Sequence, residues 1–362
     1  MAAINLERSI ERILEEQTRD GLFPTYRSEN TNDFSKPINQ EKSESLDNPG
    51  LHYFITEKLL RNHKNNPKIA ISFKHGLKVV FDNAINYNGD YFWRWLKNPN
   101  RPDYIYPPDH DDTARAMATI ETAKELMPDL IKYFEENGKY PSHLINQDYT
   151  TLLLKDLFWV DENFKPIFDD SRKEKGVFTF VRKLGFKGDN EIDPVVNLNI
   201  LYSYLLYLGN KQKEKDSIVE GIGTYLSKFV LSNKFDNTFE ELSRFYLSHA
   251  LFANIFSDVV GLDSNVFSEN VKGRVVEKMR VYKSRNVLET AFSTGALLKL
   301  GYKGEEINKG INEIVESSDN GIWPACPFYQ HKRLNHLFGS KAATSVFCLE
   351  TLTNYEIRKQ GV

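Results

Sequence analysis

The residues best suited to chemistry lie in one acidic stretch in the first third of the chain. Asp109, Asp111 and Asp112 place three carboxylates within four positions, shortly after Pro107 and Pro108. The prolines end whatever element precedes them, and the apolar periodicity that follows predicts a helix starting here. Acidic side chains are favoured at a helix N-terminus, where unpaired backbone N–H groups and the helix dipole attract negative charge. One carboxylate would suffice for that capping role, so three require a further explanation.

Three carboxyl groups this close to one another resist simultaneous ionisation. One of them is therefore expected to keep its proton at neutral pH. A carboxylic acid that stays neutral while hydrogen-bonded to ionised neighbours is a proton donor, and protonating an unreactive carbon–carbon double bond requires such a donor. The stretch thus predicts either a helix cap or a general acid for that reaction.

The elements that would position this stretch are repeated along the chain. A glycine followed two residues later by a large aromatic residue recurs, which is typical of an array of similar units. The copies are Gly21-Leu22-Phe23, Gly89-Asp90-Tyr91, Gly176-Val177-Phe178 and Gly321-Ile322-Trp323. Apolar helices of similar character also recur, with starts expected near Pro49, Asp109, Asp193, Phe245, Asn286 and Gly339.

These helices are expected to form two layers. Residues 193–202 and 288–298 carry small and apolar side chains on most faces, as inner helices do, whereas the more charged stretches 118–136 and 211–228 predict outer helices. Strand patterns are short and scattered. The sequence therefore predicts an all-α fold, a single (α/α)6 barrel of about six helical hairpins, with one domain over residues 1–362 and an irregular surface loop at 28–48.

Composition limits the classes of function. The net charge of −3 and a pI near 6.3 give no electrostatic reason to expect nucleic acid as a partner. Cys326 and Cys348 are too few for a disulfide framework, which favours a reducing, cytoplasmic setting. No stretch approaches 18 apolar residues, so the sequence predicts no transmembrane segment and a protein that is soluble or at most peripheral to a membrane.

Three motifs resemble those of a known family. Residues 109–114 match the D-x-D-D-T-A motif of class II terpene cyclases, the squalene-hopene cyclase type, in every defined position. Residues 17–23 resemble the Q-x-x-D-G-x-W repeat of triterpene cyclases with Phe in place of Trp, and 321–323 with 338–345 resembles a last repeat of this kind. Because the chain has room for one barrel, it most resembles the single-domain class II meroterpenoid cyclases.

The resemblance implies an activity and roles for the acidic residues. Such enzymes, which are intramolecular lyases or isomerases, cyclise a polyprenyl chain attached to an aromatic head group to a polycyclic meroterpenoid, by protonation and through carbocations. Asp111, the third position of the motif, would be the general acid, and Asp109 and Asp112 would polarise and anchor it. The expected partner is a small prenylated aromatic substrate, and no cofactor is expected.

A carbocation must be shielded from water and stabilised by groups that do not trap it, and aromatic faces meet that need. The aromatic candidates for substrate or cation binding are Trp93, Tyr106, Trp323 and Tyr329, followed by Trp95, Tyr104 and Phe328. The polar candidates are His110 beside the acids, Asn197 and Asn199 in an apolar helix, and Arg333 in a basic loop. Each has a structural alternative, as a core tryptophan, a capping histidine, a backbone-binding amide or a solvated charge.

A metal site is not predicted. Asp111 and Asp112 are not followed by the third aspartate of the D-D-x-x-D magnesium motif, and neither cysteine follows a carboxylate at the spacing that zinc prenyltransferases use. Two other classes of function stay open. One is an (α/α)6 carbohydrate-active hydrolase or lyase, in which Asp111 or Asp112 pairs with a carboxylate such as Glu289 across a polar cleft. The other is a non-catalytic barrel that binds an isoprenoid or a peptide in an apolar groove.

Overall fold

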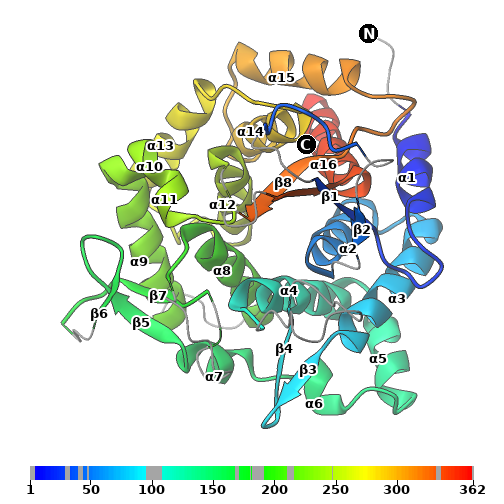
Figure 1. Cartoon of the computed structure of the whole chain (residues 1–362), viewed down its shortest axis with the longest axis horizontal. Coiled ribbons are helices and arrows are strands. Elements are labelled where there is room, and N and C mark those ends of the chain that lie inside the picture. The colour runs from blue at the N-terminus through cyan, green and yellow to red at the C-terminus, as the bar shows by residue number, and fades with distance from the viewer. Residues whose placement is uncertain are drawn as a thin grey trace.

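Two concentric layers of helices dominate the structure, a computed structural model (Figure 1). It describes residues 5–28, 33–39, 44–46, 49–94, 108–167, 171–179, 181, 191–209, 216–246, 248–331 and 336–360. Within these ranges the inner layer is formed by α2 (Pro49–His63), α4 (His110–Leu126), α8 (Pro194–Leu208), α12 (His249–Leu262), α14 (Val287–Lys299) and α16 (Lys341–Lys359). Each packs against the next, and α16 packs against α2, which closes the ring.

The outer layer covers the ring. It consists of α1 (Leu6–Glu15), α3 (Pro67–Asp82), α5 (Pro128–Glu136), α9 (Ser217–Leu231), α13 (Glu269–Arg280) and α15 (Glu305–Glu316). Short helices lie in the connections: α6 (Ser142–Ile145), α7 (Tyr149–Leu154), α10 (Asn233–Asn237) and α11 (Phe239–Leu242). The predicted (α/α)6 barrel is confirmed, and in the part of the chain that the structure describes no helix is long and apolar enough to cross a membrane.

Burial distinguishes the layers as the sequence pattern predicts. Every residue of α8 from Pro194 to Leu205 is buried, whereas α15 buries only the Ile307, Gly310, Ile311 and Ile314 stripe. The stretch 118–136 was wrongly expected to be one outer helix. Its first part continues the inner helix α4 to Leu126, and Pro128 then starts the outer helix α5, since a proline is favoured in the first turn of a helix.

Short strands form three small sheets. The largest has the antiparallel order β2-β1-β9-β8, from β1 (Thr25–Ser28), β2 (Glu44–Leu46), β8 (Cys326–His331) and β9 (His336–Ser340). β3 (Ile85–Tyr87) pairs with β4 (Asp90–Phe92), and β5 (Leu157–Val160) lies between β6 (Pro166–Ile167) and β7 (Lys175–Val177). The stretch 28–48 is therefore not only a loop, because it contains β2 and the buried Phe34 and Ile38.

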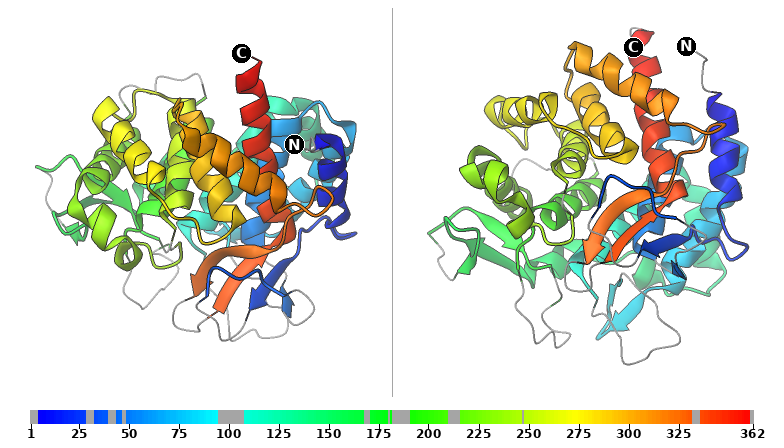
Figure 2. Two further views of the ribbon diagram at one scale, coloured as in Figure 1. Left: turned by 90° about the horizontal axis from the view of Figure 1, so that it is seen from above. Right: turned by 45° about the horizontal axis from the view of Figure 1, so that its top comes forward.

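The four-stranded sheet lies at the end of the ring where α16 begins (Figure 2). Strand β9 leads directly into α16, and the backbone N–H of Gln330 in β8 donates to the carbonyl of Phe245, 3.0 Å away, just before α12. The sheet is thus fastened to two sides of the ring, and it brings β8 close to the start of the inner helices.

The glycine–aromatic repeats share one structural role. In three of the repeats, and two residues after Gly89-Asp90-Tyr91, a backbone N–H donates to a polar side chain in the first turns of the following inner helix. The pairs are Phe23 to His52 Nδ1 (3.3 Å), Trp93 to Thr113 Oγ1 (3.1 Å), Val177 to Asn197 Oδ1 (2.8 Å) and Trp323 to Ser345 Oγ (3.0 Å). Gly21, Gly89 and Gly321 have φ near +90°, a conformation that other residues adopt only with strain. The repeat therefore fixes where inner helices begin.

Candidate active site

The acidic motif begins the inner helix α4, and its local contacts explain the residue types. Asp109 is the N-cap, and its Oδ1 accepts a hydrogen bond of 2.7 Å from the backbone N–H of Asp112. The Thr113 hydroxyl accepts from the backbone N–H of Trp93 and donates to the carbonyl of Asp109 at 2.6 Å. The Thr113 side chain thus joins Trp93, which follows the repeat, to the start of α4, and this holds the carboxylates in place.

Asp111 points to the interior of the ring, where two neighbouring elements donate hydrogen bonds to it. Asn199 Nδ2 on α8 donates to Asp111 Oδ1 at 2.5 Å, and the Tyr246 hydroxyl, just before α12, donates to Asp111 Oδ2. Asp111 is 9% exposed. Burial raises the pKa of Asp111, while the hydrogen bonds from Asn199 and Tyr246 and the charge of Arg115 act against that rise. Asp111 is therefore a carboxylic acid whose ionised form is already provided with donors.

Asp109 and Asp112 form a second, mutually repelling pair beside it. Burial and the charge of Asp111 raise the pKa of Asp109 to about 8. Burial and the charges of Asp109 and Asp111 raise the pKa of Asp112 well above its usual range. Because carboxyl groups this close titrate together, the cluster keeps at least one proton at neutral pH. Asp111 and Asp112 are buried and Asp109 is half-buried, which an acidic helix cap alone would not require.

Arg115 lies on α4 one turn after Asp111 and is connected to the same amide. Its Nη2 donates to Asn199 Oδ1, and its guanidinium carbon lies 3.7 Å from the ring centroid of Phe54 on α2. The Asn199 amide therefore lies between an acid and a permanent positive charge.

Aromatic side chains gather next to Tyr246. Its ring contacts Phe328 and Tyr329 on β8, with centroid distances of 6.3 and 6.4 Å. Phe328 also contacts Phe54 on α2 at 5.1 Å, and Tyr329 stacks on Phe338 of β9 at 4.9 Å. Of the predicted aromatic candidates in the described ranges, Tyr329 and Phe328 are the ones that the structure places near the acid.

Three other candidates occupy structural positions. The indole N–H of Trp93 donates to Val80 O of α3, and that of Trp323 donates to Ile314 O of α15, each at 2.7 Å. Both rings are at most 1% exposed. Asn197 donates to the carbonyl of Val177 and accepts from its N–H, so it binds β7. Each of the three side chains thus has a structural role, in which it joins two elements of the fold.

His110 faces away from the acids. Its Nε2 lies 3.0 Å from Asp156 Oδ2, and its backbone N–H donates to the carbonyl of Thr179 at 2.8 Å. The structure thus joins His110 to Asp156 and not to the neighbouring carboxylates. The remaining candidates Tyr106, Arg333, Trp95 and Tyr104 lie outside the described residues.

Of the two residues that donate to Asp111, Asn199 was named from the sequence only alongside Asn197, and Tyr246 was not named. Asn199 was considered with Asn197 but not preferred, although positions two apart on a helix differ by about 200° and face opposite sides. The repeat pattern contains the needed clue, since Asn197 occupies the same fourth helical position as Thr113 and His52. Tyr246 has no comparable clue, because nothing in the sequence connects it with the acidic motif.

The carbohydrate alternative required a second carboxylate at Glu289. That side chain accepts from Arg285 through its backbone N–H at 2.8 Å and through Nε at 2.9 Å, so it already has a cationic partner. The ring nitrogens of buried His52 are hydrogen-bonded to the Phe23 N–H and to the Gly76 carbonyl, and not to the acids. Among the residues that the structure describes, no group of three or more His, Cys, Asp or Glu side chains is arranged to hold a metal ion.

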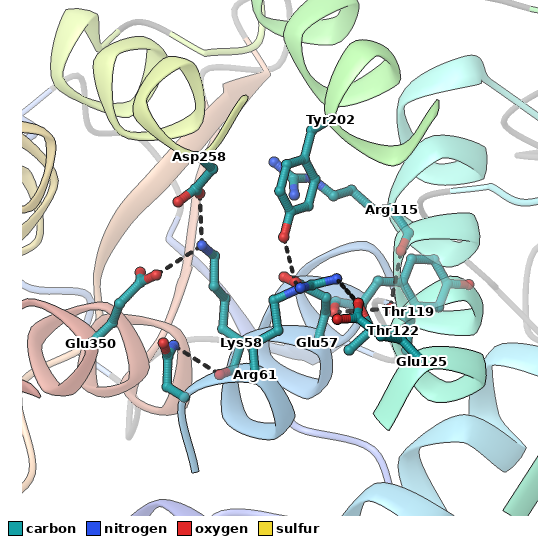
Figure 3. Close-up of polar contacts among 12 residues, drawn as sticks. Glu57, Lys58, Arg61, Arg115, Thr119, Thr122, Glu125, Tyr202, Asp258 and Glu350 are labelled. Carbon is teal, nitrogen blue, oxygen red and sulfur yellow. Dashed lines mark hydrogen bonds and ion pairs between the residues drawn. The ribbon is translucent and has the colours of Figure 1, made fainter. Parts of the chain in front are cut away.

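A second network of buried charges lies further along the inner helices, past their first turns (Figure 3). Lys58 Nζ contacts Asp258 at 2.7 Å and Glu350 at 2.9 Å, and Lys299 Nζ contacts the same two carboxylates at 2.6 and 3.0 Å. Tyr202 beside Arg115 donates to Glu57 at 2.6 Å. Lys58 and Lys299 thus neutralise Asp258 and Glu350, whereas among the described residues no lysine forms an ion pair with the aspartates at the start of α4.

Known structures share this fold. A variant of the type II terpene cyclase MstE from Scytonema, in complex with geranylgeranyl dihydroxybenzoate as substrate, matches with a TM-score of 0.58 and 10% identity over 96% of this chain and 95% of that one. A GH76 α-mannanase from Bacteroides thetaiotaomicron matches with a TM-score of 0.59 and 10% identity, over 98% of this chain and 96% of that one. The cellobiose 2-epimerase from Bacillus thermoamylovorans matches with a TM-score of 0.57 and 10% identity, over 95% of this chain and 97% of that one. No protein-family model and no curated protein matches the sequence.

Proposed function

We propose that this protein is a class II terpene cyclase, which protonates a double bond of a polyprenyl chain with Asp111 and lets the resulting carbocation close rings. The observation that carries the proposal is the environment of Asp111. It is a buried carboxyl with a hydrogen-bond donor at each oxygen, next to a carboxyl pair that keeps a proton. The D-x-D-D-T-A match at 109–114 and the shared fold support the same assignment.

Asp111 is the best proton donor of the three acids. Burial and the charges of neighbouring aspartates raise the pKa values of Asp109 and Asp112 and make them weak acids, whereas Asn199, Tyr246 and Arg115 all favour ionised Asp111. In the first step the O–H bond of Asp111 breaks and its proton forms a C–H bond at the terminal alkene. The alkene becomes a tertiary carbocation, and the negative charge stays on Asp111, where the two donors stabilise it.

The surroundings of Asp111 suit a cation better than a sugar. Phe328 and Tyr329 lie within one ring contact of Tyr246 and offer aromatic faces, which attract a cation without trapping it. Internal double bonds of the chain then attack the cation in turn, and a final proton loss returns a neutral product. For the substrate we propose a prenyl chain on an aromatic head group, the class that the complex with MstE holds.

A carbohydrate-active enzyme is the second candidate, because a mannanase and an epimerase share the fold to the same degree. The engaged Glu289 and the aromatic neighbours of Tyr246 favour the cyclase. The test is incubation of the purified protein with prenylated hydroxybenzoates, free polyprenols, prenyl diphosphates and manno- and gluco-oligosaccharides. Conversion of a prenylated arene to a cyclic isomer of equal mass supports the proposal, and turnover of an oligosaccharide alone would refute it.

A further inference from the structure

Arg115 is a buried cation with an unusual set of contacts. It is 2% exposed, and its guanidinium makes a hydrogen bond from Nη2 to Asn199 Oδ1, while Nε and Nη1 have no protein partner among the described residues. An arginine that only stabilises the fold would usually satisfy several carbonyls or carboxylates. Arg115 instead directs its bond to the amide that holds Asp111, which indicates an electrostatic role.

The spacing of Asp111 and Arg115 would normally produce an ion pair. Residues four apart lie on the same face of a helix, and opposite charges there attract. Here Asn199 lies between them, donating through Nδ2 to Asp111 and accepting through Oδ1 from Arg115. A direct contact would hold Asp111 ionised, so that it could not donate a proton. The amide keeps the two groups apart and still connects them.

We propose that Arg115 is a positioning residue that acts through the Asn199 amide to fix Asp111 and to stabilise the carboxylate left after proton transfer. The inference rests on the proposed function, since it concerns how the same acid is tuned. A guanidinium bonded to an amide oxygen polarises that amide, and its N–H then donates more strongly to the acid. In a buried site such a fixed charge needs no reorganisation when the proton leaves.

The guanidinium is held in place by aromatic faces. Its carbon lies 3.7 Å from the Phe54 centroid and 5.4 Å from that of Tyr202, whose hydroxyl is anchored on Glu57 (Figure 3). Stacking of this kind restrains a long side chain that makes few hydrogen bonds. Because Arg115 already occupies the face of Phe54, the aromatic faces left for a substrate cation are those near Tyr246.

Other charged and titratable groups face Asp111 and must be included in any account of its titration. They are Asp109, Asp112 and Arg115 on α4, Asp193 at the N-cap of α8, Tyr246 before α12 and Tyr149 on α7. The aspartates disfavour ionised Asp111, and Arg115 is the cation in this set. Removing its charge should therefore make Asp111 a weaker acid.

The experiment titrates Asp111 itself. Protein labelled with ¹³C at the aspartate carboxyls is followed by infrared or NMR spectroscopy, with the Asp111 band assigned by its loss in Asp111→Asn. Arg115→Met should move the Asp111 midpoint up by about one pH unit, as expected for loss of a nearby opposite charge. Arg115→Lys keeps the charge and should move it much less. Arg274→Met, the same change at an arginine of the outer helix α13 that binds Asp236, is the matched control and should not move it.

Turnover should follow the titration. Arg115→Met is expected to lose about tenfold in kcat near neutral pH while the alkaline limb of its pH profile moves up by about one unit, because a weaker acid keeps its proton longer. Loss of packing would lower activity without moving that limb. An unchanged midpoint in folded Arg115→Met, or in Arg115→Gln if the first variant misfolds, would overturn the inference. A shifted midpoint in a protein without cyclase activity would refute the proposed function and leave the Arg115–Asp111 coupling standing.

Discussion

Two groups of buried acids in the same ring behave in opposite ways. Burial opposes ionisation of Asp258, yet the charges of Lys299 and Lys58 overcome it and hold the pKa of Asp258 below its ordinary value. At the start of α4, burial and the charges of neighbouring aspartates raise the pKa values of Asp109 and Asp112, and no lysine among the described residues forms an ion pair with them. Burial alone thus does not decide what an acid does. A buried carboxyl with a lysine partner stays ionised, whereas buried carboxyls beside one another hold a proton more tightly.

The largest effect is expected when the proposed proton donor, Asp111, is removed. Asp111→Asn keeps the size of the side chain, so the fold should survive, but it removes the acidic proton. Cyclisation should fall by about 10²- to 10⁴-fold, the usual range for loss of general acid catalysis. Steady-state turnover and circular dichroism together measure this. Asp148→Asn makes the same chemical change at the exposed cap of α7 and should keep full activity. A folded Asp111→Asn variant near the wild-type rate would return the motif to the role of a helix cap.

The second cluster should respond in stability and not in chemistry. Lys58→Met leaves Asp258 and Glu350 with less positive charge in a buried site, and breaking a buried ion pair from one side costs about 3–5 kcal/mol. Denaturant unfolding measures the loss. Lys78→Met removes the exposed partner of Asp82 and should change stability by about 0.5 kcal/mol or less. Equal effects of the two variants would show that the buried lysine is not the neutralising group.

The two clusters should also differ in how stability depends on pH. Asp109 has a raised pKa in the folded state, about 8, so its contribution is fully present below the unfolded value near 3.8 and is lost as pH rises toward 8. Asp258 has a lowered pKa, so its contribution is lost as pH falls below the ordinary carboxyl range. Asp109→Asn should therefore flatten the decline of unfolding free energy between about pH 4 and 8. An unchanged slope in that variant would show that Asp109 ionises normally.

The smallest expected effect is that of a chelator. The acid cluster is proposed to work by protonation, with no metal-held diphosphate, so EDTA should leave the turnover of a prenylated arene unchanged. The measurement compares rates with and without EDTA and after addition of magnesium. Loss on chelation with recovery on magnesium would instead indicate a diphosphate substrate.

Much of the ring could be predicted because helix starts are marked locally. Asp109, Asp193 and Asn286 cap α4, α8 and α14, and Pro49 and Pro194 occupy first turns, so these starts were placed correctly. The start of α12 was expected at Phe245 but lies at His249, after the cap Ser248. The aromatic residues before it are not helical, and this places Tyr246 where it reaches Asp111. That contact joins residues far apart in the chain, and no local pattern reports it.

The site was predictable in its acids and less so in its partners. The spacing of Asp109, Asp111 and Asp112 predicted an acid cluster that keeps a proton, and the resemblance to the D-x-D-D motif supplied the separate role of Asp111. Which of Asn197 and Asn199 meets the acid depends on the rotation of α8, which is set when Asn197 binds the backbone of Val177. Trp93 and Trp323 could be taken for pocket residues because the sequence does not show that their indole N–H groups bond to Val80 and Ile314.

The most direct test of the central claim is the origin of the initiating proton. Carboxyl protons exchange with solvent, so if Asp111 is the donor, cyclisation of a prenylated arene in deuterated water should place one deuterium on carbon in the terminal ring of the product. Mass spectrometry gives the number of deuterium atoms, and NMR gives the position. Protonation by Asp111 should give a product with one deuterium, on the carbon of the former terminal alkene that receives the proton. A cyclic product without solvent deuterium would contradict it.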